Sequence, residues 1–476
     1  MAIPQHLTKI VATIGPASRS PDVFRKMVLS GVTVARLNFS HGSYADHAKT
    51  IAMIRDISEE LDIPITILQD LQGPKIRVGE LPPAGLQLVE GTTVTLVPKD
   101  NFQQSEATNP EAIAIDYAYI AEEVSIGTQI LLADGLFELQ VSGVAGNAVH
   151  CEVIKGGLLT SHKGVNFPSL TLRLPSMTDK DCQDLAFGLE HDVDWVSLSF
   201  VRQAEDVRLL RRMITEYGKS DVSIIAKIEK PQAIANLEEI LTVVDGIMVA
   251  RGDLGVEMPP ERVPMIQKQI IRRCNEMGIP VITATQMLES MIQNPRPTRA
   301  EASDVANAIM DGTDAVMLSG ESAVGDYPLQ AVEIMTKIAA EVEKDVKFRN
   351  YPASRTDEVH AISEALHVIA DVIDFRYIVA FTATGYTAIL ASKERLKTPI
   401  IALSPNPHVY HRLNLVWGVK PLLLNEEVDT FEKVLQQVES CLLDRQLAVK
   451  GDRILIVGGI PMGIQGGTNF LKIHVL

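Results

Sequence analysis

The stretch I-T-I-L-Q-D-L-Q-G-P-K-I-R-V-G, residues 65–79, joins a short apolar run to a sharp turn and mixed charge. The apolar run predicts a β-strand that is covered on both faces. Asp70 ends this run, and a Gly-Pro turn then leads to Lys75 and Arg77. Charge that appears only where a buried strand ends is typical of a parallel sheet with functional side chains at its carboxyl edge.

Similar runs recur along the chain, with helix-like stretches between them. They are K-I-V-A-T (9–13), V-T-V-A-R-L-N (32–38), W-V-S-L-S-F (195–200), S-I-I-A-K-I-E (223–229), G-I-M-V-A-R-G-D (246–253), V-I-T-A-T (281–285) and A-V-M-L-S-G (315–320). Together with 65–70 they make eight strand–helix units, which predict an α/β fold of the closed (β/α)8 TIM-barrel type. One helix is well marked, since T-R-A-E (298–301) forms a capping box and Gly312 can end the helix.

The spacing of the units is interrupted once, after the third strand. Residues 73–170 are rich in Val, Thr and Gly and contain hairpin-like turns at 133–135 and 145–147. We expect an inserted all-β domain, a β-barrel lid at the mouth of the main barrel. The barrel itself then comprises 1–72 and 171–345, and strands at 377–382, 399–404 and 453–458 predict a C-terminal α/β domain over 346–476.

Composition restricts the partners. The chain has 476 residues, a net charge of −16 and four cysteines without a C-x-x-C pair. An acidic protein of this kind is not expected to bind nucleic acid or an anionic membrane. Its cysteines favour a reducing compartment, and its start shows no secretory h-region, so we expect a cytoplasmic protein.

Polar residues follow seven of the eight predicted strands. Beyond Asp70, Lys75 and Arg77, they are Arg36, Asn38, Ser40, His41, Ser197, Ser199, Arg202, Lys227, Glu229, Arg251, Gly252, Asp253, Thr283, Thr285, Gln286, Ser319 and Glu321. Any one of them could simply mark the point where a strand reaches the surface, but their recurrence favours a catalytic face. Arg36, Arg77 and Lys227 suit phosphate oxygens, whereas Glu229 and Asp253 suit a hard divalent cation that keeps waters and takes substrate oxygens.

The sequence resembles the pyruvate kinase family over nearly its whole length. The motifs that carry this resemblance are A-T-I-G-P-A-S-R (12–19), A-R-L-N-F-S-H-G (35–42), D-L-Q-G-P-K-I-R (70–77), A-K-I-E-K (226–230), M-V-A-R-G-D-L-G-V-E (248–257), A-T-Q-M-L-E-S-M (284–291) and P-R-P-T-R-A-E-A-S-D-V-A-N-A (295–308). The resemblance implies transfer of the phosphoryl group of phosphoenolpyruvate to ADP, giving pyruvate and ATP in the last step of glycolysis. It also implies a homotetramer.

The resemblance further implies a role for each matching residue. Arg36, Ser199 and Lys227 would contact the substrate phosphate, and Lys227 would stabilise the group in transfer. Glu229 and Asp253 would hold Mg²⁺ or Mn²⁺. The N–H groups of Gly252 and Asp253, with the Thr285 hydroxyl, would bind the substrate carboxylate. Thr285 would serve near the enolate, directly or through water and Ser319. Many relatives carry Asn in place of Lys230.

Two further sites are implied in the same way. The nucleotide site would be lined by Thr13, Pro16, Asn38, Arg77 and Lys163. A monovalent-cation site, commonly for K⁺, would use Asn38, Ser40, Asp70 and the carbonyl of Leu71. Members with Lys in place of Glu at position 75 can dispense with K⁺, so we expect Lys75 to replace the ion. The alternative is that Lys75 is a solvated hinge residue.

The C-terminal domain contains a loop that matches the family's effector site, T-A-T-G-Y-T (382–387), and its companion G-I-Q-G-G-T-N (463–469). The implied ligands are Thr382, Thr384, Gly385, Tyr386, Thr387, Gly467 and Thr468. Ala383 and Tyr386 stand where some relatives activated by fructose 1,6-bisphosphate carry cations, so a sugar monophosphate or a nucleotide is at least as good a candidate for the phosphorylated allosteric effector.

Two other functions remain open at this stage. One is a Mg²⁺-dependent C–C lyase acting on an enolpyruvate-type substrate, which the insert and Lys227 disfavour because a lyase needs no lid over ADP. The other is a catalytically dead regulatory protein, for which we would expect losses among Arg36, Lys227, Glu229, Asp253 and Thr285. All five residues are present.

Overall fold

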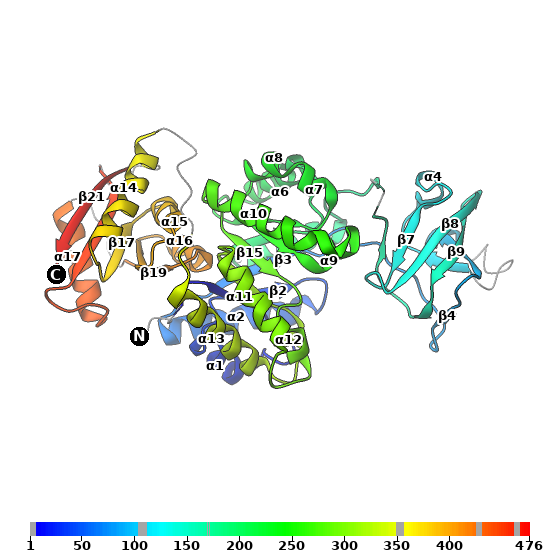
Figure 1. Ribbon diagram of the computed structural model, residues 1–476, viewed down its shortest axis with the longest axis horizontal. Helices are drawn as coiled ribbons and strands as arrows, with labels where there is room; N and C mark the ends of the chain where they lie inside the picture. The colour runs from blue at the N-terminus through cyan, green and yellow to red at the C-terminus, as the bar shows by residue number, and fades with distance from the viewer. Residues whose placement is uncertain are drawn as a thin grey trace.

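A computed structural model describes residues 6–102, 112–168, 170, 172–348, 357–424, 431–460 and 467–476. In Figure 1 the barrel lies in the middle, the inserted β-sheets lie at one end of the molecule, and the C-terminal sheet lies at the other. Each of these three regions has a hydrophobic core of its own. Among the described residues, no helix is both long and apolar enough to cross a membrane.

Eight parallel strands close into the predicted barrel in the order β1-β16-β15-β14-β13-β12-β3-β2. Their bounds are β1 Lys9–Thr13, β2 Val34–Asn38, β3 Thr66–Asp70, β12 Trp195–Leu198, β13 Ser223–Ile228, β14 Gly246–Ala250, β15 Val281–Ala284 and β16 Ala315–Leu318. The longer helices around them are α1 Pro21–Leu29, α2 Tyr44–Leu61, α5 Asp179–Glu190, α6 Ala204–Glu216, α10 Val263–Met277, α11 Arg299–Met310 and α13 Pro328–Asp345. The shorter ones are α7 Pro231–Ala235, α8 Leu237–Leu241, α9 Arg251–Glu257 and α12 Gly320–Ala323. The predicted capping box of α11 is confirmed, with Thr298 as N-cap and Gly312 following the helix at φ 94°.

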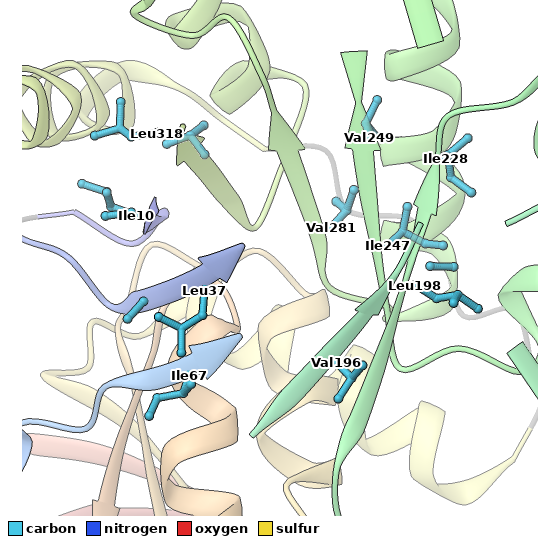
Figure 2. Close-up of a cluster of buried hydrophobic side chains, with 14 of the residues drawn as sticks. Ile10, Leu37, Ile67, Val196, Leu198, Ile228, Ile247, Val249, Val281 and Leu318 are labelled. Atoms are coloured by element: carbon cyan, nitrogen blue, oxygen red, sulfur yellow. The ribbon is translucent and has the colours of Figure 1, made fainter. Parts of the chain in front are cut away.

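Alternation along the strands separates two layers of the barrel core. Residues such as Ile10, Ile67 and Leu198 belong to the large cluster that also includes helix residues, and Figure 2 shows them on their strands. Their neighbours, such as Leu68 and Ile225, belong to a separate cluster made almost entirely of strand residues. Because every second residue shares a face, Asp70 and Lys227 point to the same side as Leu68 and Ile225, which is the barrel interior.

The insert consists of two sheets. A six-stranded sheet has the order β11-β7-β8-β9-β5-β6, and a two-stranded sheet joins β10 to β4. The bounds are β4 Leu86–Leu88, β5 Thr93–Pro98, β6 Ala112–Ile115, β7 Gln129–Leu132, β8 Phe137–Ala145, β9 Ala148–Lys155, β10 Gly157–Leu159 and β11 Val165–Asn166, with a short helix α4 Ile120–Glu123. The predicted all-β insert is confirmed, and its barrel is a half-barrel, because β10 leaves the larger sheet directly after β9, at Gly157, where φ is 153°. Both predicted hairpin turns are confirmed.

The C-terminal sheet has the order β19-β18-β17-β20-β21, and its last strand is antiparallel. Its elements are α14 Glu358–Val372, β17 Tyr377–Phe381, α15 Tyr386–Lys393, β18 Ile400–Ser404, α16 Pro407–Arg412, β19 Val419–Leu423, α17 Phe431–Asp444, β20 Arg453–Gly459 and β21 Thr468–Val475. The three strands predicted from sequence are β17, β18 and β20. The two edge strands, β19 and β21, are additions that the structure supplies.

The C-terminal domain closes the end of the barrel at which the parallel strands begin. Leu415 is part of the interior barrel cluster. Trp195 donates from its indole Nε1 to the Arg412 carbonyl at 3.2 Å, at the start of β12. Arg395 and Asp314 form an ion pair across the same boundary at 2.9 Å, and both side chains are only 4% exposed. The carboxyl ends of the strands, where the sequence-predicted polar residues lie, are at the opposite end, which faces the insert.

The Arg395–Asp314 pair provides a test of how the two domains hold together. Replacing Arg395 by Met leaves a buried carboxylate without its cation, which is expected to cost about 3–5 kcal/mol of unfolding free energy. The matched control is Arg445→Met, because Arg445 pairs with Asp62 across the same boundary but in a more exposed position. That pair should contribute at most about 1 kcal/mol. Urea unfolding of the three proteins measures both effects, and equal losses in the two variants would contradict the expectation.

Candidate active site

Asp70 lies at the centre of the charged cluster at the carboxyl ends of the barrel strands. Its side chain is 1% exposed, and its Oδ2 accepts a hydrogen bond from Arg36 Nε at 2.7 Å. Its Oδ1 accepts from Ser197 Oγ at 2.8 Å and lies 3.3 Å from Lys227 Nζ. Burial alone would raise the pKa of this carboxyl, but the charges of Lys227 and Arg36 and the bond from Ser197 outweigh burial and lower it. Asp70 is therefore an anion that fixes two cations.

Lys227 is held as a charged ammonium in a buried position. Its Nζ donates to Ser199 Oγ at 2.8 Å and lies 3.0 Å from Glu229 Oε1. Burial would lower the pKa of this lysine, but the carboxylates of Asp70 and Glu229 more than compensate and raise it. The positive charge of Lys227 is thus retained in a buried position beside two carboxylates.

Glu229 follows β13 and is fully buried. Its Oε2 accepts from the Phe200 backbone N–H at 2.8 Å. Its Oε1 receives no hydrogen bond in the described part of the chain, although Lys227 Nζ is nearby. Burial raises the pKa of Glu229, Lys227 opposes this rise, and the charge of Asp253 adds to it. A cation between Glu229 and Asp253 would relieve both burial and repulsion.

Asp253 lies in the first turn of α9. The sequence places R-G-D at the end of the sixth predicted strand, and in the structure β14 stops at Ala250 and R-G-D begins the helix. Asp253 Oδ1 is 3.1 Å from Lys75 Nζ, which also lies 3.5 Å from Asp134 Oδ1 of the insert. Burial would lower the pKa of Lys75, but Asp253 and Asp134 raise it overall. Lys75 is therefore a charged bridge between the insert and α9.

Thr285 has a backbone conformation that is rare for a β-branched residue, with φ 69°. Its Oγ1 accepts from the Gly252 N–H at 2.7 Å and donates to the Ala284 carbonyl at 2.6 Å. The Ser319 N–H donates to Glu321 Oε2 at 2.7 Å. A single cavity is lined by residues that include Lys75, Gly252, Asp253, Thr285 and Ser319. The structure thus brings together the sequence-predicted residues from four separate strand ends.

Arg251 is a residue to which the sequence gives no role. Its Nη2 donates to the Thr285 carbonyl at 2.7 Å, its Nε donates to the Ala284 carbonyl at 3.2 Å, and its Nη1 donates to Asp304 Oδ1 at 2.8 Å. The guanidinium therefore clamps the strained end of β15 to α9. The only sequence signal was a cation directly after a strand, and its partners lie more than thirty positions away along the chain.

The residues expected at a nucleotide site fall into two groups. Thr13 is buried, and its Oγ1 accepts from Arg36 Nη1 at 2.8 Å, which ties it to the Asp70 cluster. Pro16 is exposed and follows β1, and Asn38 is half-buried at the end of β2. Arg77 and exposed Lys163 belong to the insert, where the Val78 N–H donates to the Lys163 carbonyl at 2.8 Å. The structure brings Arg77 and Lys163 together, and it ties Thr13 to the barrel site.

The residues expected at a monovalent-cation site are partly engaged with protein groups. Asn38 Oδ1 accepts from the Ser40 N–H at 3.1 Å, and the Leu71 carbonyl accepts from Ser199 Oγ at 2.7 Å. Both Asp70 oxygens face cations, as described above. Lys75 reaches Asp253 and Asp134, so its ammonium lies beside the divalent-metal candidate residue.

The expected effector loop is ordered by its own hydroxyls. Thr382 Oγ1 accepts from the Gly385 N–H at 2.9 Å, and Gly385 has φ 87°. Thr387 and Thr468 share a hydrogen bond of 2.8 Å, which brings the two expected loops together. Thr384 accepts from Arg412, Tyr386 is 38% exposed, and Gly467 directly precedes Thr468. Residues 463–466 of the companion loop lie outside the described residues.

A barrel with this charged mouth, an inserted pair of sheets and a C-terminal α/β sheet defines a multidomain phosphotransferase. Family models agree with each part of the chain, since pyruvate kinase barrel domain matches residues 5–332 and pyruvate kinase alpha/beta domain matches residues 360–474. The chain belongs to the pyruvate kinase family. Its activity is that of EC 2.7.1.40, for which phosphoenolpyruvate and ADP are the implied substrates.

Full-length relatives support this assignment. Pyruvate kinase 2 of Synechocystis sp. is 49% identical, over 98% of this chain and 79% of the relative. The pyruvate kinase of Clostridium acetobutylicum is 43% identical, over 98% of this chain and 99% of the relative. That of Geobacillus stearothermophilus is 44% identical, over 98% of this chain and 80% of the relative.

The backbone of Thr285 yields a prediction about stability. Thr285→Ala and Thr285→Gly both remove the hydroxyl, but only Gly adopts a φ of 69° without strain. Thr285→Gly should therefore be more stable than Thr285→Ala by about 1 kcal/mol. Urea unfolding of the two variants side by side measures the difference. If Ala is as stable as Gly here, the strain at this position has been misjudged.

Proposed function

We propose that this chain transfers the phosphoryl group of phosphoenolpyruvate to ADP, with Lys227 as the cation that stabilises the group in transfer. The observation that carries this assignment is the buried ammonium of Lys227, held 3.3 Å from Asp70 and 3.0 Å from Glu229. A fixed positive charge in a dry site stabilises charge that develops on a transferring phosphoryl group without reorganisation at that moment. Arg36, which shares Asp70 with Lys227, and Ser199, which accepts from Lys227 Nζ, bind the same phosphate.

The carboxylate of the substrate lies against the start of α9. The Gly252 N–H and the Thr285 hydroxyl are already within 2.7 Å of each other, so both polar groups face one part of the cavity wall. In this structure the Gly252 N–H donates to Thr285 Oγ1 and the Thr285 hydroxyl donates to the Ala284 carbonyl. Both donors would have to turn from these partners to the substrate, where they and the Asp253 N–H would bind its carboxylate. Thr285 and Ser319 line the same cavity, and we assign the proton for the enolate to Thr285, directly or through water and Ser319.

Glu229 and Asp253 are the residues that would hold a divalent cation. Both offer oxygen, which suits Mg²⁺ or Mn²⁺, and the unbonded Oε1 of buried Glu229 fits this role. Two carboxylates leave positions that substrate oxygens and water would fill, as is usual for Mg²⁺. When bound, the ion neutralises phosphate oxygens. Lys227 and Lys75 balance the two carboxylates in its absence.

We assign the nucleotide to the space between the barrel and the insert. Thr13, Pro16 and Asn38 form its barrel side, and Arg77 and Lys163 form its insert side. Closure of the insert would bring Lys163 to ADP and exclude water from the reaction. This assignment places the domain boundaries at 72/73, 170/171 and 345/346 and makes the insert a lid.

Regulation and assembly follow from the same family assignment. We propose that a phosphorylated metabolite binds at Thr382, Thr384, Gly385, Tyr386 and Thr387, together with Gly467 and Thr468, and modulates activity in a cytoplasmic homotetramer. The contact between Thr387 and Thr468 supports a single site built from both loops. Phosphosugars and nucleotides can be compared directly through their effect on the phosphoenolpyruvate saturation curve.

The role of Lys227 is tested by Lys227→Met. The variant is expected to lower kcat by roughly three orders of magnitude or more, with a modest change in phosphoenolpyruvate affinity, because the ammonium acts mainly on the transition state. Steady-state kinetics and direct binding measure the two terms. Lys219→Met is the matched control, since Lys219 pairs with Asp192 on the barrel surface. A turnover of Lys227→Met close to the unmodified protein would refute the assignment.

The role of Lys75 is tested by exchanging the monovalent cation. Because Lys75 supplies a tethered positive charge next to Asp253, activity should persist when a bulky organic cation replaces K⁺. Lys75→Glu adds a third carboxylate beside Asp253 and Asp134, so this variant should require K⁺. Rates in the two salts at equal ionic strength measure the dependence. Strong K⁺ activation of the unmodified enzyme would falsify the proposal.

A further inference from the structure

One buried carboxylate connects the insert to the barrel. Glu257 accepts from Asn166 Nδ2, on strand β11 of the insert, at 2.7 Å. The same oxygen, Oε1, accepts from Lys230 Nζ, in the loop after β13, at 2.5 Å. The Glu257 side chain is 1% exposed and that of Lys230 is 19% exposed. Glu257 therefore holds an insert residue and a barrel residue at a single point.

Both Glu257 and Lys230 are connected to the candidate active site. Glu257 is the last residue of α9, the helix whose first turn carries Gly252 and Asp253. Lys230 directly follows Glu229, and its ammonium lies 5.6 Å from the centre of the Phe200 ring. The Phe200 N–H in turn donates to Glu229. A displacement of Lys230 would thus shift the carboxylates of both Glu229 and Asp253.

Apolar packing alone does not fix this joint. A pocket lies next to Lys230, and its lining includes Pro74, Ile76, Phe167, Leu172 and Phe200. Side chains that border such a space have fewer contacts to resist a shift than those of a filled core. Lys75 of the insert also bridges to Asp253 of α9, at 3.1 Å, and the two side chains are 22% and 27% exposed. Water competes for the Asp253 carboxylate more than for that of Glu257, which is 1% exposed.

We propose that Lys230, Glu257 and Asn166 form a latch that sets the angle of the insert over the substrate cavity, with Lys230 as its positioning residue. The latch affects the binding of ADP more than the binding of phosphoenolpyruvate. The proposed contacts to phosphoenolpyruvate lie on the barrel, whereas the contacts to ADP are shared with the insert. This kinetic part rests on the proposed function above. The geometric part, the angle of the insert, does not.

The geometric part is tested by distance measurement on the full chain. Nitroxide labels at exposed Val144 of the insert and exposed Leu29 of α1, in a background with the half-buried Cys182 and Cys441 replaced by Ser, report the distance distribution. We expect a narrow distribution for the parent and a broader one for Lys230→Met and for Asn166→Ala. Lys230→Arg should restore the narrow one, and Lys219→Met should leave it unchanged. Asn166→Ala keeps the test valid if Lys230→Met does not fold.

The kinetic part is tested with the same variants without labels. Lys230→Met should raise the KM for ADP about tenfold, as expected from loss of a hydrogen bond to a charged group, with little change in phosphoenolpyruvate affinity. The double variant Lys230→Met/Glu257→Gln should raise the KM for ADP by less than the product of the two single effects, because both substitutions remove the same contact. An unchanged distance distribution in both Lys230→Met and Asn166→Ala would overturn the latch. If the parent formed no ATP, the proposed function would fail, and the distances would still decide the latch.

Discussion

The contact on which the site depends is the buried carboxylate of Asp70 between Arg36 and Lys227. Three charges inside a barrel would be costly one by one, and they are stable here because each offsets another and Ser197 completes the set. The arrangement requires three different strands to end at the same level, which the parallel neighbours β13-β12-β3-β2 of the barrel provide. The barrel thus fixes the charges, and the charges in turn hold Lys227 protonated for an anionic substrate.

Much of the fold could be predicted from sequence because buried parallel strands are apolar on both faces, and all eight barrel strands have that pattern. The C-terminal sheet shows where the pattern fails. Strand β19 contains Lys420 and Pro421, which argue against a strand in the middle of a sheet, and it is in fact an edge strand. The R-G-D of residues 251–253 marks the end of β14 by its charge, but the sequence alone does not show that it forms the first turn of α9.

The site was predictable to a similar extent, and for a physical reason. Strand ends of one barrel converge, so any polar residue at such an end is a candidate without knowledge of its partners. Partners that lie on helices or on the insert leave no such mark. The clamp from Arg251 to Asp304 and the contact from Lys230 to Glu257 each join positions that only the folded chain brings together. Thr285 was identifiable by type, but its positive φ was not.

The two domains attached to the barrel differ in how far the barrel core depends on them. The insert brings its own core and enters through a short hinge after β3, so a barrel without it would lose its cover but keep its interior filled. The C-terminal domain places Leu415 in the interior cluster and Arg395 against Asp314, so a barrel without it would expose apolar strand residues to water. The two attached domains are therefore not equivalent: the core of the barrel is complete without the insert, whereas it includes part of the C-terminal domain.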